Sequence, residues 1–169
     1  SAFVVGIGPG SYTGLRIGLS AAKGFSYALQ VPIMGISTLH TLVAQAREHA
    51  ITRTGTCWPM IDARRMEVFT QPMDFAGAAH GTVRAVILDP AWAHDNRGSI
   101  VFGDGAEKAG PIWQEAGIDV LEGVRPVAAS MATEAFRRYQ AQEFDDLAYL
   151  VPNYGKAANV TQPRKRSAL

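Results

Sequence analysis

The chain has 169 residues, enough for one domain of ordinary size or for two small, tightly joined ones. Its hydrophobic fraction of 47% and charged fraction of 18% are typical of a globular protein with a real core, and its formal net charge of +1 gives no whole-chain field toward nucleic acid or membrane. No apolar run of about 18 residues is present to span a bilayer, and the first residues lack the basic start of a signal peptide.

The first third of the chain alternates strand and helix patterns. A short apolar run over residues 2–7 predicts a buried strand, and a helical pattern follows the glycine-rich loop from about Thr13 to Leu29, with Ser11 or Thr13 as its N-cap. Residues 31–36 predict a second buried strand, and Ser37 and Thr38 begin a helix that runs to about His49. This order is typical of an α/β layer with parallel strands.

A polar stretch over residues 52–56 predicts a boundary, after which the pattern is α+β. The expected elements are strands over 58–61 and 67–71 around a turn at 62–65, an apolar run over 83–88, a helix begun by Asp89 and Pro90, a buried strand near 99–105, and helices over 106–116 and 127–139. The last helix is expected to be amphipathic, with six apolar residues at helical spacing: Ala128, Met131, Ala132, Ala135, Phe136 and Tyr139. From Pro152 onward all the charges are basic.

Cys57 is the single cysteine, so no disulfide can form within the chain. A lone thiol fits a reducing cytosol, and we expect a cytoplasmic protein. Because Cys57 precedes Trp58 and Pro59 in an apolar stretch, we expect a buried, unreactive thiol rather than a reactive one.

The loop between the first strand and the first helix is a candidate anion site. It contains Gly8, Pro9, Gly10, Ser11 and Thr13 and leads into a helix N-terminus, where exposed N–H groups and the helix dipole favour negative charge. It matches neither the P-loop pattern nor the G-x-G-x-x-G pattern of dinucleotide-binding proteins. A purely structural turn is the alternative.

The first helix carries small residues four apart: Gly14, Gly18 and Ala22, with Ala21 and Ala28 near the same stripe. Glycine inside a helix costs about 1 kcal/mol relative to alanine. Two such glycines on one face indicate the close approach of another backbone. The approaching backbone is either the chain's own sheet and neighbouring helix, or a helix of another subunit, and the sequence favours neither.

These segments resemble the TsaB (YeaZ) family. The resemblance rests on Gly8 to Leu42, which begins Gly-Pro-Gly-Ser-Tyr-Thr-Gly-Leu-Arg-Ile-Gly, on Ile61 to Phe69, and more weakly on Leu150 to Tyr154. It implies two ribonuclease-H-like halves of the actin-like ATPase and sugar-kinase superfamily, here 1–54 and 55–169. It also implies that the first half is incomplete, because the family has leading strands and a helix upstream of Ser1. We therefore expect an open sheet edge.

The resemblance implies a non-catalytic scaffold for threonylcarbamoylation of tRNA adenosine 37 (t6A). Its partners would be a TsaD-like catalytic paralogue and a TsaE-like ATPase, with homodimers when the chain is alone, only indirect tRNA contact, and no cofactor. The partner interface would contain Gly14, Leu15, Gly18, Ala21, Ala22 and Phe25.

Two enzyme hypotheses remain beside the scaffold. One is a nucleotide-binding ATPase-like enzyme, which the glycine loop supports. The other is a glycoprotease-like metalloenzyme, but His40, His49, His80 and His94 include no pair spaced four apart to hold a metal on one helix face.

The turn of Asp62, Arg64 and Glu67 predicts either a salt bridge that fixes the hairpin or an acid–base site. The tail bases Arg164, Lys165 and Arg166 are expected to be solvated, with contact to tRNA phosphate as the alternative.

Overall fold

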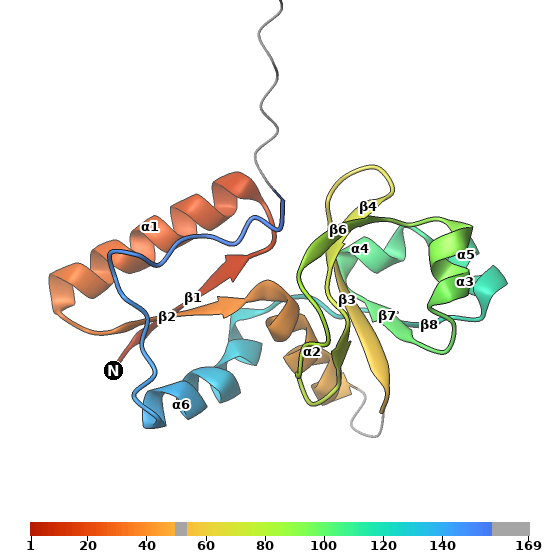
Figure 1. Ribbon diagram of the computed structural model, residues 1–169. Helices are drawn as coiled ribbons and strands as arrows, with labels where there is room; N and C mark the ends of the chain where they lie inside the picture. The colour runs from red at the N-terminus through yellow and green to blue at the C-terminus, as the bar shows by residue number, and fades with distance from the viewer. Residues whose placement is uncertain (50–53, 157–169) are drawn as a thin grey trace, which may run out of the picture.

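The computed structural model describes residues 1–49 and 54–156 and shows two sheets side by side (Figure 1). The first sheet pairs β1 (Phe3–Gly8) with β2 (Ile33–Ser37) in parallel. The helix α1 (Tyr12–Leu29) connects these strands and packs against β1, and α2 (Thr38–His49) follows β2. The predicted alternation of strand and helix is thus confirmed. Among the described residues, β1 pairs with β2 alone, so its other edge is open.

The second sheet is mixed, with strand order β6-β4-β3-β7-β8 and β5 paired to β3 beside that path. Its strands are β3 (Thr56–Asp62), β4 (Glu67–Thr70), β5 (Met73–Asp74), β6 (Arg84–Ile87), β7 (Ile100–Phe102) and β8 (Asp119–Leu121). The strands β3 and β4 form the predicted antiparallel hairpin, and β7 joins β3 in parallel. β5 and β8 were not predicted, because two- and three-residue strands carry no periodic signal.

Both faces of the second sheet are buried. Alternate residues of β3 point to opposite faces, so Cys57 and Ile61 contact one cluster while Trp58 and Met60 contact another. The first cluster contains Leu39, Leu42, Val43 and Ala46 of α2, so α2 covers this sheet although it follows the first. The other face is covered by α3 (Pro90–Asp95), α4 (Asp104–Glu107) and α5 (Gly110–Ala116). Cys57 is fully buried, which raises its thiol pKa to about 12, so the predicted burial of this thiol is confirmed.

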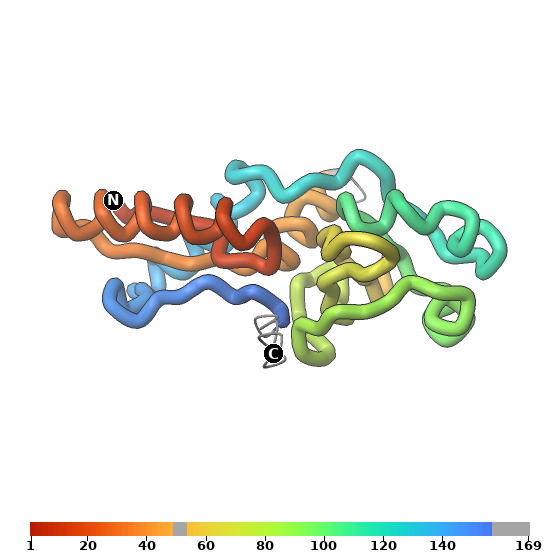
Figure 2. Tube along the Cα trace, turned by 90° about the horizontal axis from the view of Figure 1, so that it is seen from above, coloured from red at the N-terminus to blue at the C-terminus, as the bar shows by residue number. Residues whose placement is uncertain are grey.

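After the second sheet the chain returns to the first. A short 3₁₀ helix, η1 (Ala128–Met131), leads into α6 (Ala132–Gln140), whose Ala135 packs with Met34 and Ile36 of β2. Residues 145–156, the C-terminal segment, then run along the first sheet and α1 toward the second sheet (Figures 1 and 2). The predicted unit 55–169 therefore contains a segment that packs with residues 1–49, and a division near residue 54 stays a prediction.

Two predicted helices differ from those observed. The helix expected over 106–116 is broken between α4 and α5, because Pro111 has no N–H to bond the carbonyl of Glu107. The helix expected over 127–139 begins as the 3₁₀ turn η1, whose three residues per turn break the predicted apolar register. Of its six apolar residues, Ala135 is buried and Met131 is partly buried against the same cluster, whereas Phe136 is 63% exposed.

Candidate functional site

The glycine loop joins β1 to α1 at the boundary between the two sheets. Ser11 is the N-cap of α1, and its hydroxyl accepts a hydrogen bond from the N–H of Gly14 at 3.3 Å. Gly8 has a φ of 104°, and a side chain there would overlap the carbonyl oxygen of Asn153 in the C-terminal segment. The glycine at position 8 is therefore explained by the structure, because the absence of a side chain lets two backbones approach closely. Gly10 has open space around it.

The loop and the hairpin turn, predicted separately, face each other across one cleft of about 740 Å³. One wall is Gly10, Ser11, Tyr12 and Thr13, and the opposite wall is Ile61, Asp62, Ala63, Arg64, Glu67, Phe69 and Asp104, with Tyr154 and Lys156 completing the lining. The cleft thus combines the start of an 18-residue helix with charged side chains from the second sheet. Tyr154 and Lys156 were not predicted as site residues, because contacts of a coil segment carry no sequence signal.

The carboxylates of the hairpin pair with lysines from outside it. The Asp62 carboxylate accepts from the Arg64 backbone N–H at 2.8 Å, but its ion pair is with Lys108. Glu67 pairs with Lys156 at 2.9 Å. The hydrogen bond from Lys108 holds the pKa of the Asp62 carboxyl below its ordinary value. The prediction of a salt bridge within the hairpin was therefore wrong, since these pairs tie the turn to α4's end and the C-terminal segment instead.

The charges of the cleft do not form an evident anion site. Asp62, Glu67 and Asp104 bring three carboxylates to its wall, against the cations of Arg64 and Lys156. A phosphate group placed here would meet repulsion from these carboxylates as well as attraction from the helix N-terminus.

No group of three or more His, Cys, Asp or Glu side chains within residues 1–49 and 54–156 is arranged to hold a metal ion. His40, on α2, is partly buried, which lowers its imidazole pKa, while Glu134 raises it by less. His80 and His94 lie on the surface beside Asp74 and Asp95. His49 ends α2, and its side chain lies outside the described residues.

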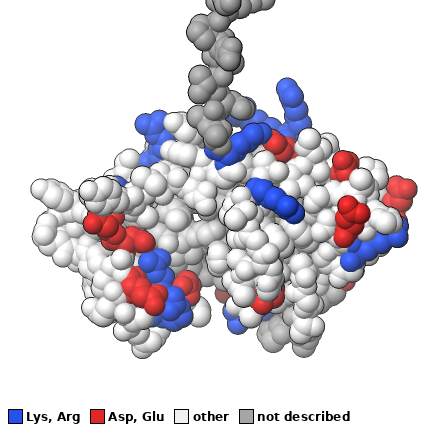
Figure 3. All heavy atoms as spheres, in the orientation of Figure 1, with Lys and Arg blue, Asp and Glu red and all other residues white. Residues whose placement is uncertain are grey.

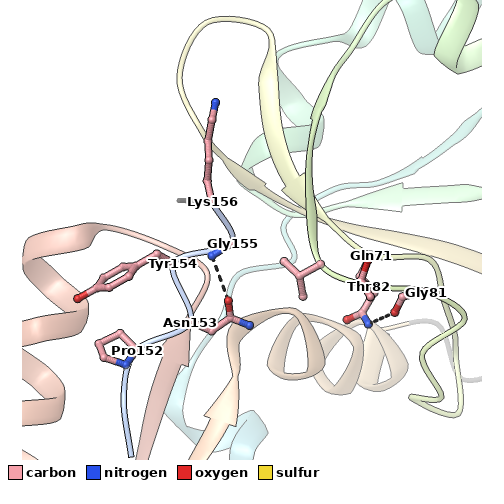
Figure 4. A pocket seen from close by; sticks show the side chains of 9 residues that line it. Gln71, Gly81, Thr82, Pro152, Asn153, Tyr154, Gly155 and Lys156 are labelled. Atoms are coloured by element: carbon pink, nitrogen blue, oxygen red, sulfur yellow. Dashed lines mark hydrogen bonds between the residues drawn. The ribbon is translucent and has the colours of Figure 1, made fainter. Parts of the chain in front are cut away.

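A second groove, of about 690 Å³, lies where the C-terminal segment passes the loop after β4 (Figure 4). The Gln71 side chain donates to the Gly81 carbonyl on one wall, and Asn153 accepts from the Gly155 N–H on the other. Tyr154 points from this segment toward α1 (Figure 4). Gly155 fits against Phe69 and Pro9, where a side chain would touch both. The C-terminal segment therefore bridges the two sheets.

The helix α1 exposes a face without charge. Seven residues at helical spacing form this apolar stripe: Gly14, Ile17, Gly18, Ala21, Phe25, Ala28 and Leu29. Ile17, Phe25 and Leu29 are 65%, 58% and 64% exposed. Among the residues that the structure describes, a methyl group added at Gly18 would meet nothing within 4 Å, and one added at Gly14 would touch only Ser11. Packing of these glycines on the chain's own sheet, one of the two explanations that the sequence left open, is therefore wrong.

The remaining predicted interface residues differ in their exposure. Ala21 and Phe25 are exposed, and the Phe25 ring stacks on Phe3 of β1 at 5.8 Å. Ala22 and Leu15 are half-buried, and the Leu15 side chain lies against Gly8. Ile17 and Leu29 were not predicted, because the prediction rested on the spacing of small residues, although both fall on the same side of the helix.

Sequence comparison assigns the chain to a family. A family model described as "TsaD: tRNA N6-adenosine threonylcarbamoyltransferase" matches residues 1–91. The TsaB protein of Escherichia coli (strain K12) is 31% identical over 141 residues, and that of Bacillus subtilis (strain 168) is 46% identical over 70 residues; both are described as tRNA threonylcarbamoyladenosine biosynthesis proteins. The chain belongs to the TsaB (YeaZ) family.

Solved structures agree with this membership. The structure described as YeaZ from Pseudomonas aeruginosa superposes with a TM-score of 0.70 at 22% identity, over 90% of this chain and 73% of that one. A second Pseudomonas structure, of an uncharacterized protein with similarity to peptidase YeaZ, gives the same TM-score at 23% identity over 92% and 73% of the two chains. The predicted α/β fold of the actin-like ATPase type is confirmed.

The similarity to the TsaB relatives is partial in length. The alignment covers 78% of this chain and 60% of the Escherichia coli protein, and 41% of this chain and 29% of the Bacillus subtilis protein. The chain thus spans less than two thirds of either relative. Within the described residues, none of the helices is long and apolar enough to cross a membrane.

Proposed function

We propose that this chain is a non-catalytic subunit for the synthesis of threonylcarbamoyladenosine at tRNA position 37. It pairs with a TsaD-like catalytic paralogue through the apolar stripe of α1, and a TsaE-like ATPase joins the pair. Family membership supports the pathway, because the TsaB relatives are described as t6A biosynthesis proteins and the matching family model is that of the transferase. Two ribonuclease-H-like halves and a cytoplasmic location belong to the same proposal.

The observation that carries the interface is the open space beside Gly18. Glycine at an exposed helix position costs about 1 kcal/mol, and no contact among residues 1–49 and 54–156 offsets that cost. A second helix lying along the stripe would offset this cost, because glycine and alanine let two backbones approach closely. The stripe also has no charge to desolvate, and its large side chains Ile17, Phe25 and Leu29 surround the small ones.

The decisive experiment measures the mass of the chain, alone and mixed with the TsaD-like paralogue, by size exclusion with light scattering. We expect a heterodimer, and Gly18→Leu should abolish it because the added side chain fills the approach. Ser20→Leu is the matched control: it places the same leucine side chain on α1 two residues on, about 200° around the helix. A homodimer that ignores the paralogue would overturn the proposal, as would equal effects of the two variants.

Nucleotide binding in the cleft is the second candidate. The start of α1, Ser11, Thr13 and Arg64 favour it, and the three carboxylates oppose it. A nucleotide at about one hundred times its Kd should raise the free energy of unfolding by about 2.7 kcal/mol, seen as a thermal shift. A shift that Arg64→Gln removes would establish this function, and unchanged melting with ATP, ADP and AMP would exclude it.

A further inference from the structure

The near-neutral net charge conceals a separation of charges along the chain. Residues 1–47 and 147–169 contain seven of the 16 Lys and Arg residues and none of the 15 Asp and Glu residues. The described parts of these two segments lie side by side, because the C-terminal segment runs along α1 and the first sheet (Figure 1). On the face shown in Figure 3, the acidic atoms of this half gather near α6 and the start of the C-terminal segment. Within the described residues, these two stretches contribute Arg16, Lys23, Arg47 and Lys156 and no acid, while Asp145 and Asp146 precede the second stretch.

A second face of α1 alternates tyrosine and basic residues. Tyr12, Arg16, Lys23 and Tyr27 are spaced four, seven and four apart, so they share one side of the helix. This side lies away from the apolar stripe, about 180° around the helix from Gly18 to Tyr27. Tyr12 and Tyr27 are 57% and 71% exposed. Fifteen residues of helix separate them, about 22 Å at 1.5 Å per residue, which is room for several nucleotides.

The start of this face is a cluster of three planar groups. The Arg16 guanidinium lies 5.3 Å from the centre of the Tyr12 ring and donates to its hydroxyl at 3.1 Å. On the C-terminal segment, Tyr154 lies 4.8 Å from Tyr12 with a tilt of 31°. Planar guanidinium and phenol groups held in this way are surfaces on which a nucleobase stacks.

The C-terminal segment extends the face along its length. The Lys23 ammonium donates to the carbonyls of Ala148 and Leu150, which places Tyr149, 82% exposed, beside α1. The nearest acids are engaged: Asp145 pairs with Arg138, and Asp146 accepts from the N–H groups of Ala148 and Tyr149. Within the described residues, the hydrogen bonds of Arg16 and Lys23 thus go to neutral partners, so no carboxylate there competes with a phosphate for them.

We propose that this aromatic–basic strip, formed by Tyr12, Arg16, Lys23, Tyr27, Tyr149 and Tyr154, binds single-stranded RNA directly. Bases stack on the tyrosines and the guanidinium, while the backbone phosphates meet Arg16 and Lys23. The strip and the apolar stripe lie on different sides of α1, so RNA and a protein partner can bind together. The choice of RNA over DNA rests on the proposed function; the binding mode does not. It replaces the expectation of indirect tRNA contact with a direct one.

The test is fluorescence anisotropy of a labelled oligouridine of about ten nucleotides with the chain alone. Tyr12→Ala should weaken binding about tenfold, and Tyr12→Phe, which keeps the ring, should not. Between about 50 and 200 mM salt, Arg16→Gln and Lys23→Gln should each reduce the slope of log K against log salt by about 0.7. Arg97→Gln removes the same charge from an exposed position on the second sheet's side and should leave the slope unchanged.

Several results would overturn the proposal that the strip binds RNA. These are no binding at low salt, equal binding by Tyr12→Ala and the wild type, or binding of matching DNA while RNA fails. Polyglutamate bound as tightly, with the same dependence on Tyr12, would assign the surface to an acidic peptide instead. Since no paralogue is present, the two proposals fail separately: a heterodimer without RNA binding removes only the strip, and RNA binding without a heterodimer removes only the scaffold.

Discussion

The two sheets use similar apolar side chains in opposite ways. Around the second sheet, Phe102, Val101 and Trp113 are almost fully buried between α2 on one face and α3–α5 on the other. Around the first sheet, every residue of β1 before Gly8 is only half-buried, and Phe25 and Leu29 of α1 stand in solvent. The second sheet completes a core within the chain, whereas the first leaves apolar surface for contact with something else.

The comparison is sharpest between two phenylalanines. Phe102 is fully buried in β7, so Phe102→Ala should lower the free energy of unfolding by about 3–5 kcal/mol. Phe25 is exposed, and Phe25→Ala should change it by less than about 0.5 kcal/mol. Urea unfolding followed by the fluorescence of Trp58, Trp92 and Trp113 measures both. Equal losses would mean that the stripe is packed within the chain and is no contact surface.

A glycine next to the second sheet extends this comparison from side chains to the backbone. Gly103 has a φ of 98° and a ψ of 170°, a region that only glycine occupies readily, and an added methyl would overlap the carbonyl oxygen of Met60. Gly103→Ala should therefore destabilise the chain by at least about 1–3 kcal/mol in the same unfolding measurement. A neutral result would show that β7 and α4 can shift, so that the second sheet is looser than its burial indicates.

Local signals in the sequence predicted most of the fold. Ser11 and Asp89 cap α1 and α3 as expected, and the spacing of strand and breaker residues located β1, β2 and the β3–β4 hairpin. The failures lie where distant contacts decide. Lys108 and Lys156 form ion pairs with the carboxylates of the hairpin. Phe136 of α6 faces outward because η1 shifts the register of the helix.

The candidate sites were predicted in pieces rather than as a whole. The loop at Ser11 and the turn at Asp62 were both identified, but nothing in one sequence indicates that they share a cleft. The stripe at Gly14 and Gly18 was visible from its spacing, but whether it faced the chain's own sheet was not, because large apolar residues lie both on this stripe and on the inner face of α1. The Tyr12–Tyr154 stack joins residues 142 positions apart in the chain and has no local signature.

Gly18→Ala should have the opposite sign to Gly103→Ala. The new methyl group meets nothing, so the isolated chain should gain about 0.5–1 kcal/mol from helix propensity alone. The melting temperature of the isolated chain measures this gain, and Gly24→Ala, also in open space on α1, should match it. In the complex the two should separate, with Gly18→Ala weakening the heterodimer. A loss of stability in the isolated chain would show that its own residues cover the stripe.

The smallest expected effect is a pH dependence from the boundary between the two regions. Burial lowers the pKa of His40 on α2 below its ordinary 6.5, so the unfolded chain takes up a proton at a higher pH than the folded one. The stabilising contribution of neutral His40 is therefore complete above pH 6.5 and is lost as the pH falls from 6.5 toward the folded value. Glu134, whose pKa is lowered chiefly by its hydrogen bond with Arg137, stays ionised in this range and loses its own contribution only at more acidic pH. Urea unfolding between about pH 5 and 7.5 should show a slope that His40→Gln reduces and that the exposed His94→Gln leaves unchanged. An unchanged slope in His40→Gln would mean that this imidazole is in solvent and that α2 packs less closely between the two sheets than its burial indicates.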